Sequence, residues 1–181
     1  MKLESKAWVV VLTALLYFLF FELNNLLFAS LNHAKAVDWI FLPSGLRLLF
    51  ILLFGASGAT GIATSSFALG YAYYFPNDWI TSLGAALVSG FSPLIARNFC
   101  DYWFGLDANL EKLSSRILLK LAFVFALASA ALHQTWYFLR GHGEEQFHVG
   151  FTAMATGDFL GSLIVLYLVR LALVLLPLRQ D

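Results

Sequence analysis

Long apolar runs, separated by short polar or small-residue segments, occupy most of the chain. A helix that crosses a bilayer needs about 20 mostly apolar residues, and the lengths of the runs predict about six spanning helices. Their expected bounds are residues 8–28, 39–55, 61–75, 79–99, 116–139 and 147–178. The sequence therefore predicts one all-α, polytopic membrane domain that extends over residues 1–181.

The connecting segments carry the residues that usually form turns and loops. Residues 30–38 are polar, residues 56–60 are small, and Pro76-Asn77-Asp78 is a turn signal. The last apolar run is longer than one span requires, so it is expected to tilt or to break near Gly157 or Gly161.

Residues 101–115 form the longest polar stretch of the chain. Leucines alternate with charged residues there, a pattern that predicts a short helix on the membrane surface. Its charged side chains would then be available to a cytoplasmic partner; they are Asp107, Glu111 and Lys112.

The composition favours the same class of protein. Hydrophobic residues make up 60% of the chain and charged residues 12%, where an ordinary soluble domain has about 25% charged residues. Mean hydropathy is +0.78. A formal net charge of zero argues against nucleic-acid binding, and the single cysteine, Cys100, allows no internal disulfide.

Basic residues in the short loops predict the orientation. With both termini inside, eight basic residues fall on the cytoplasmic side and only Lys35 and Arg140 fall outside. The eight are Lys2, Lys6, Arg97, Lys112, Arg116, Lys120, Arg170 and Arg179. We therefore expect an N-in, C-in protein, integral to a membrane of the bacterial cytoplasmic (inner) type and surrounded by lipid.

Ionisable residues inside predicted spans suggest a polar cluster. Such residues are costly in a bilayer and are usually functional; Glu22, Arg47 and Asp158 are the three here. At 1.5 Å per residue, Arg47 lies about 14 Å and Asp158 about 16 Å below the outer ends of their predicted helices. They are therefore expected to face each other. Polar residues that could complete a cavity opening outward are Asn25, Ser44 and His133; the alternative is a purely structural ion pair.

Small residues mark the expected helix contacts, because they let backbones approach closely. Gly157 and Gly161, four residues apart on the last predicted helix, are the main candidates. Packing within the bundle is favoured, and a dimer interface is the alternative.

Catalytic and cofactor patterns are missing from the sequence. The histidines are scattered and no metal-ligand spacing is present, so neither haem nor a metal is expected. The residues before Ser89-Gly90 are Leu87-Val88, which departs from the Gly-x-Ser-Gly motif of rhomboid proteases. Prenyl endopeptidases have an arginine four residues after the second glutamate of a Glu-Glu pair. After Glu144-Glu145 that position is Val149. These departures predict a non-enzymatic protein without a cofactor.

Two segments resemble the membrane-associated sensor (MASE-type) domains. Phe41-Leu42-Pro43-Ser44-Gly45-Leu46-Arg47 is similar to the family's Pro-x-Gly segment in an early helix, and Gly157-Asp158-Phe159-Leu160-Gly161 is similar to its Asp-x-x-Gly segment near the last helix. The family usually has about eight spans and an attached output domain, and Leu42 replaces its first proline. The resemblance implies a sensor domain that signals through another membrane protein, because this chain ends directly after its last predicted helix.

Three functions follow from these observations. The leading hypothesis is a stand-alone sensor module that binds a membrane protein partner and a small ligand from the outer side. The first alternative is the substrate-binding component of an energy-coupling-factor-like transporter, and the second is an accessory subunit of a larger membrane complex.

Overall fold

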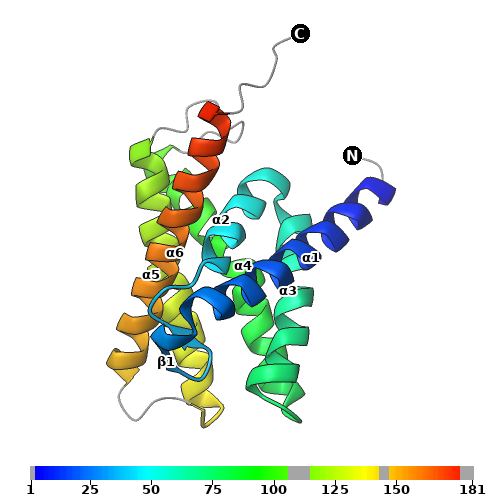
Figure 1. The fold of residues 1–181 in the computed structure, drawn as a ribbon, viewed down its shortest axis with the longest axis vertical. Coiled ribbons are helices and arrows are strands. Elements are labelled where there is room, and N and C mark those ends of the chain that lie inside the picture. The colour runs from blue at the N-terminus through cyan, green and yellow to red at the C-terminus, as the bar shows by residue number, and fades with distance from the viewer. Residues whose placement is uncertain (1–2, 106–114, 143–146, 176–181) are drawn as a thin grey trace.

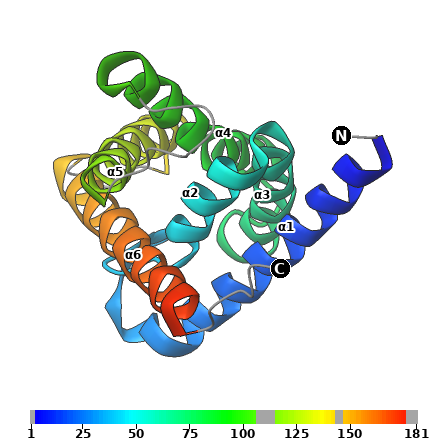
Figure 2. The same ribbon diagram turned by 90° about the horizontal axis from the view of Figure 1, so that it is seen from above.

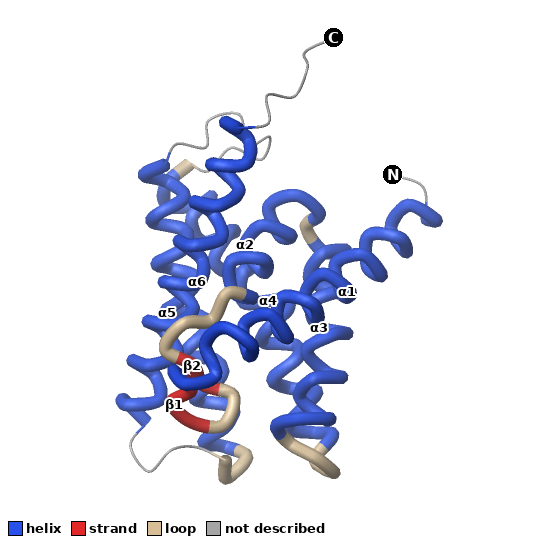
Figure 3. Tube along the Cα trace, in the orientation of Figure 1, coloured by secondary structure: helices blue, strands red, loops and turns tan. Residues whose placement is uncertain are grey.

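The computed structural model describes residues 3–105, 115–142 and 147–175, and nearly all of them are helical (Figures 1 and 3). The predicted all-α class is confirmed. The elements in chain order are α1 (Leu3–Phe28), η1 (Ala29–Leu31), β1 (Asn32–Ala34), β2 (Val37–Asp38), α2 (Pro43–Phe54), α3 (Ala56–Leu69), η2 (Gly70–Tyr74), α4 (Trp79–Phe104), α5 (Ser115–Leu139) and α6 (Phe147–Leu175).

Four helices in the described residues are long and apolar enough to cross a membrane, namely α1, α4, α5 and α6. Their outer faces carry large exposed hydrophobic side chains, for example Trp8, Leu26 and Tyr167. Exposure of this extent suits a lipid environment, since soluble monomers rarely expose large apolar patches. These helices are compatible with an integral membrane protein.

The second predicted span is a short helix in the centre of the bundle. The prediction began it at residue 39, but α2 begins at Pro43, a favoured residue for a first helical turn. Its 12 residues reach only about 18 Å, against about 30 Å of bilayer hydrocarbon. Nine of the 12 are buried, and Figure 2 shows the other helices grouped around α2.

A single glycine joins α2 to α3. Gly55 has a φ of 54°, which glycine adopts without the steric penalty of a side chain. The predicted turn at residues 56–60 is therefore wrong, because these residues form the first turn of α3. The helical path continues through the π-helical turn η2 and ends before Asn77, whose φ is also positive.

The longer helices differ from the predicted bounds at their ends. Asp78 caps α4 by accepting a hydrogen bond from the backbone of Thr81. The helix then continues through Pro93 to Phe104, which includes the start of the predicted surface helix. Residues 106–114, including Asp107, Glu111 and Lys112, lie outside the described residues. The predicted break in α6 is absent, since the helix is continuous through Gly157 and Gly161.

The two ends of the bundle differ in structure (Figure 1). The start of α1, the α2–α3 junction and the end of α6 lie at one end, which we call the terminal end. The antiparallel hairpin β1–β2 and the turn before α4 lie at the other, the hairpin end. The hairpin forms within the polar connector at residues 30–38. It is held by the side-chain amide of Asn32, which donates to Asp38 over 2.8 Å.

Candidate functional site

A non-helical connecting segment, residues 39–42, carries the chain from the hairpin into the middle of the bundle. Such a segment leaves backbone groups without helical partners, and these must be satisfied when buried. The amide of Phe41 donates to the carbonyl of Gly157 over 3.2 Å. The amide of Leu42 donates to the side-chain oxygen of Asn24 over 2.9 Å. Helices α6 and α1 thus supply the acceptors that allow α2 to begin inside the protein.

Two glycines of α6 leave room for this segment. A Cβ atom at Gly157 would collide with the carbonyl oxygen of Asp38, and one at Gly161 with the carbonyl oxygen of Phe41. The close backbone approach predicted at these glycines is present. Its partner is the connecting segment, however, whereas a neighbouring helix had been expected.

Ser44 connects the start of α2 to α6. Its hydroxyl oxygen lies 2.7 Å from the carbonyl oxygens of Phe41 and Asp158, and 3.3 Å from the hydroxyl of Ser162. The single hydroxyl proton can serve only one acceptor at a time. These contacts fix the position of Asp158 relative to the first turn of α2.

Arg47, one turn further along α2, is held by an aromatic hydroxyl group. Its Nε and Nη2 atoms donate to the Tyr17 hydroxyl over 3.0 and 2.7 Å. Its Nη1 atom lies 3.9 Å from Asp158 Oδ1, and both side chains are more than 90% buried. The predicted pairing of Arg47 with Asp158 is present, but this distance is too long for a hydrogen bond.

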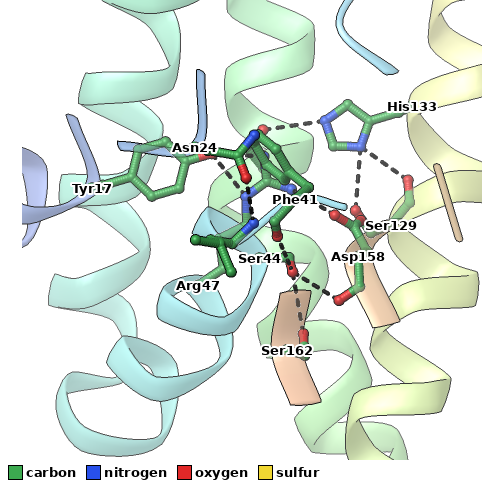
Figure 4. A network of polar contacts seen from close by, with 11 residues as sticks. Tyr17, Asn24, Phe41, Ser44, Arg47, Ser129, His133, Asp158 and Ser162 are labelled. Atoms are coloured by element: carbon green, nitrogen blue, oxygen red, sulfur yellow. Dashed lines mark hydrogen bonds and ion pairs between the residues drawn. The ribbon is translucent and has the colours of Figure 1, made fainter. Parts of the chain in front are cut away.

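His133 connects α5 to α4. Its Nδ1 atom lies 2.9 Å from the backbone carbonyl of Ser129, and its Nε2 atom lies 3.2 Å from the hydroxyl of Ser89. A carbonyl oxygen can only accept, so Nδ1 carries a proton and Nε2 can accept from the serine as part of a neutral ring. Figure 4 shows this histidine beside the cluster of Tyr17, Arg47 and Asp158.

These groups surround a cavity of about 60 Å³, enough for a few water molecules. Two of its polar atoms, Asp158 Oδ2 and Ser66 Oγ, are buried and have no hydrogen-bond partner among the described residues. Its charged and polar walls are Asp38, Arg47, Ser66, Ser89, His133 and Asp158, and its aromatic walls are Tyr17, Phe21, Phe41, Tyr74, Phe75 and Tyr137.

The six residues predicted for a polar cluster are only partly brought together. Arg47, His133 and Asp158 line the cavity, and Ser44 lies behind its wall against Asp158. Glu22 and Asn25 are half-buried and do not line it. Glu22 Oε1 has no hydrogen-bond partner among the described residues, and Arg47 has Tyr17 and Asp158 as its partners.

Tyr17, Asn24, Asp38 and Ser66 were not among the residues predicted from the sequence. A signal for two of them was available, because Tyr17, Phe21 and Asn24 follow the spacing i, i+4, i+7 that places residues on one helix face. All three are at least 98% buried. Asp38 was assigned to a loop, and nothing in the sequence indicated that the hairpin folds back over the bundle.

Asp38 lies at the hairpin end of the cavity and is buried at 8% exposure. Burial raises the pKa of its carboxyl group, the Asn32 hydrogen bond opposes this rise, and the nearby charge of Asp158 adds to it. Two carboxylates therefore share one partly enclosed space, an arrangement that favours a positive group between them.

The terminal side of the cavity is closed by apolar packing. A cluster of buried side chains from α2, α4 and α5 fills this region; it consists of Leu48, Leu52, Ala96, Cys100, Leu121, Ala122 and Phe125. No group of three or more His, Cys, Asp or Glu side chains suited to a metal ion occurs in the described ranges.

Comparison of the chain with protein-family models, with characterised proteins and with solved structures gives no significant match.

Proposed function

We propose that this chain is a non-enzymatic membrane module that binds a small polar ligand in the central cavity, entered from the hairpin end. The observation that carries the proposal is the pair of unpartnered buried atoms, Asp158 Oδ2 and Ser66 Oγ, on the cavity wall. A buried polar atom without a partner costs about 1–3 kcal/mol. A ligand or water that hydrogen-bonds to both atoms would remove that cost.

The short central helix supports a binding role. Non-helical backbone at membrane depth is tolerated where it is buried in protein or lines a cavity. Interrupted helices also build the binding sites of many transporters. Here the break before α2 brings Asp38, Phe41 and Arg47 to one cavity.

The apolar cluster at the terminal side favours binding and sensing over passage through the protein. Leu48, Leu121 and Phe125 are fully buried there, so a ligand in the cavity would meet a closed floor. Ligand binding would then be transmitted to the cytoplasmic side by a movement of α2, and a membrane protein partner would detect that movement. The proposal includes the N-in, C-in orientation, in which the hairpin end faces outward.

A panel of small polar compounds tests the proposal by thermal unfolding of the purified protein in mild detergent. At least one compound should stabilise the protein saturably, because a ligand that binds only the folded state raises its stability. The variant Ser66→Leu should fill the cavity and lose this response. Thr64→Leu, on the exposed face of the same helix, should keep it. A panel without any stabilising compound, or an equal response in Ser66→Leu, would refute ligand binding in the cavity.

A further inference from the structure

The charges on the cavity wall do not balance. Asp38 and Asp158 each contribute a carboxylate, and Arg47 contributes one positive charge. The contact of His133 with the Ser129 carbonyl places a proton on Nδ1, and because the ring is buried its neutral form is favoured over a second positive charge. With all three charged groups ionised, the residues that line the wall carry one negative charge in excess, and an anionic ligand would meet net repulsion from them. The exposed Lys35 is not one of the lining residues, although its ammonium lies 5.4 Å from the ring centre of Phe75.

Two of the three nitrogen atoms of the Arg47 guanidinium already make hydrogen bonds. Nε and Nη2 donate to Tyr17, and the guanidinium carbon lies 5.0 Å from the ring centre of Phe41. The unpartnered carboxylate oxygen on the wall, among the described residues, is Asp158 Oδ2. A ligand that fits must therefore supply a hydrogen-bond donor at this position.

The aromatic walls suit a positive group. The face of an aromatic ring attracts a cation within about 6 Å of its centre. Three cavity rings already meet a cation of the chain itself: Tyr17 and Phe41 meet Arg47, and Phe75 meets the Lys35 ammonium at 5.4 Å. Tyr74 packs edge-on against Phe21 with ring centres 5.9 Å apart, so these two rings form a fixed part of the wall.

We infer that the cavity binds a small organic ammonium ion, a protonated amine whose N–H groups donate to Asp158 and Asp38 and whose carbon chain lies against the aromatic rings. This inference rests on the proposed function and specifies its ligand class. The described residues hold no group of three or more His, Cys, Asp or Glu side chains for a metal ion, whereas an alkylammonium uses both the carboxylates and the rings. The raised pKa of Asp38, caused by its burial and by the charge of Asp158, agrees with a site that lacks a counter-charge.

Three probes of equal size test the charge of the ligand: propylammonium chloride, 1-propanol and sodium propionate. Thermal unfolding of the purified full chain is measured against each, with ionic strength held constant by sodium chloride. Propylammonium should raise the unfolding temperature saturably, and the neutral and anionic probes should leave it unchanged. A saturable response to propanol or propionate without one to propylammonium would overturn the ammonium class and leave ligand binding intact.

Two variants test the site itself. Asp38→Asn can retain the contact with Asn32 and should weaken the apparent propylammonium affinity tenfold or more. Tyr74→Leu keeps every charge, removes one ring and should weaken it at least threefold. Asp101→Asn, an exposed acid on α4 outside the cavity, should leave it unchanged. Unchanged affinity in both Asp38→Asn and Tyr74→Leu, or no response to propylammonium in the parent protein, would overturn the inference. The compound panel with Ser66→Leu would still decide the proposed function independently.

Discussion

Tyr17 and Arg47 are joined by two hydrogen bonds across the contact between α1 and α2, with the guanidinium donating over 3.0 and 2.7 Å to one phenol oxygen. The phenol therefore fixes the direction of the guanidinium and leaves its Nη1 atom facing Asp158 at 3.9 Å. Three helices meet through this arrangement: α1 supplies the hydroxyl, α2 the cation and α6 the carboxylate.

Removing the Tyr17 hydroxyl should destabilise the fold. In Tyr17→Phe, two donors of a buried cation lose their acceptor, at a cost of about 1–3 kcal/mol. Unfolding in mixed detergent micelles measures the loss. Tyr167→Phe is the matched control, because Tyr167 is 66% exposed. Equal stability of the two variants would show that Arg47 does not depend on Tyr17.

The neighbouring asparagines of α1 should differ sharply in importance. Asn24→Leu leaves the buried amide of Leu42 without an acceptor, and we expect a loss of about 1–3 kcal/mol. Asn25→Leu, at a half-buried position, should cost much less. Protein yield in membranes and the unfolding temperature report both effects. A larger loss in Asn25→Leu would contradict the assignment of Asn24 as the support of the connecting segment at residues 39–42.

Even a methyl group should be too large at Gly157. Its Cβ would meet the Asp38 carbonyl oxygen, which belongs to the backbone and cannot turn away. Gly157→Ala should therefore cost about 1–3 kcal/mol through overpacking and should also shift the hairpin. Gly70→Ala is the control: its Cβ would lie at an ordinary 3.5 Å from the Cβ of Ser82. If Gly157→Ala were as stable as Gly70→Ala, the segment would not lie against α6 as described.

Cysteine labelling tests the orientation. In a Cys100→Ala background, the variants Lys35→Cys and Asn77→Cys place thiols at the hairpin end, and Asp101→Cys places one on α4 toward the terminal end. A membrane-impermeant thiol reagent added to intact cells should label the first two and reach the third only after permeabilisation. The excess of basic residues at the terminal end is the physical basis of this expectation. The reverse labelling pattern would refute the N-in, C-in proposal.

Asp78 should make stability depend on pH. The Thr81 hydroxyl and amide, followed by His142 and Arg140, hold the pKa of this carboxyl group well below its usual range. A lowered folded-state pKa stabilises the protein above the ordinary aspartate value of about 4, and the benefit is lost as the pH falls toward the lowered value.

Asp78→Asn should therefore unfold at a lower temperature than the parent near pH 7, and the difference should shrink below about pH 4. Asp101→Asn, which replaces an exposed acid, should show no such trend. If the difference in unfolding temperature between the parent and Asp78→Asn stayed constant from neutral to acidic pH, the ionised Asp78 carboxylate would be excluded as the source of that difference.

The lengths of the apolar runs predicted about six spans, and four of these are the long helices, because lipid-facing and core-facing positions are both apolar in a membrane helix and give an unmistakable run. The cost of a buried charge likewise predicted that Arg47 and Asp158 would meet. Neither signal depends on which helices are neighbours.

Only the tertiary structure determined why α2 starts at Pro43, why Asn24 matters more than Asn25, and which backbone lies against Gly157. Residues 39–42 are as apolar as a helix, and they remain a non-helical connection in which Gly157 and Asn24 accept from the amides of Phe41 and Leu42. One acceptor comes from the preceding helix α1 and the other from the last helix, α6. Because a hydrogen bond requires a defined distance and direction, which hydropathy does not encode, the hydrogen bonds that organise the polar centre became visible only when the helices were packed together.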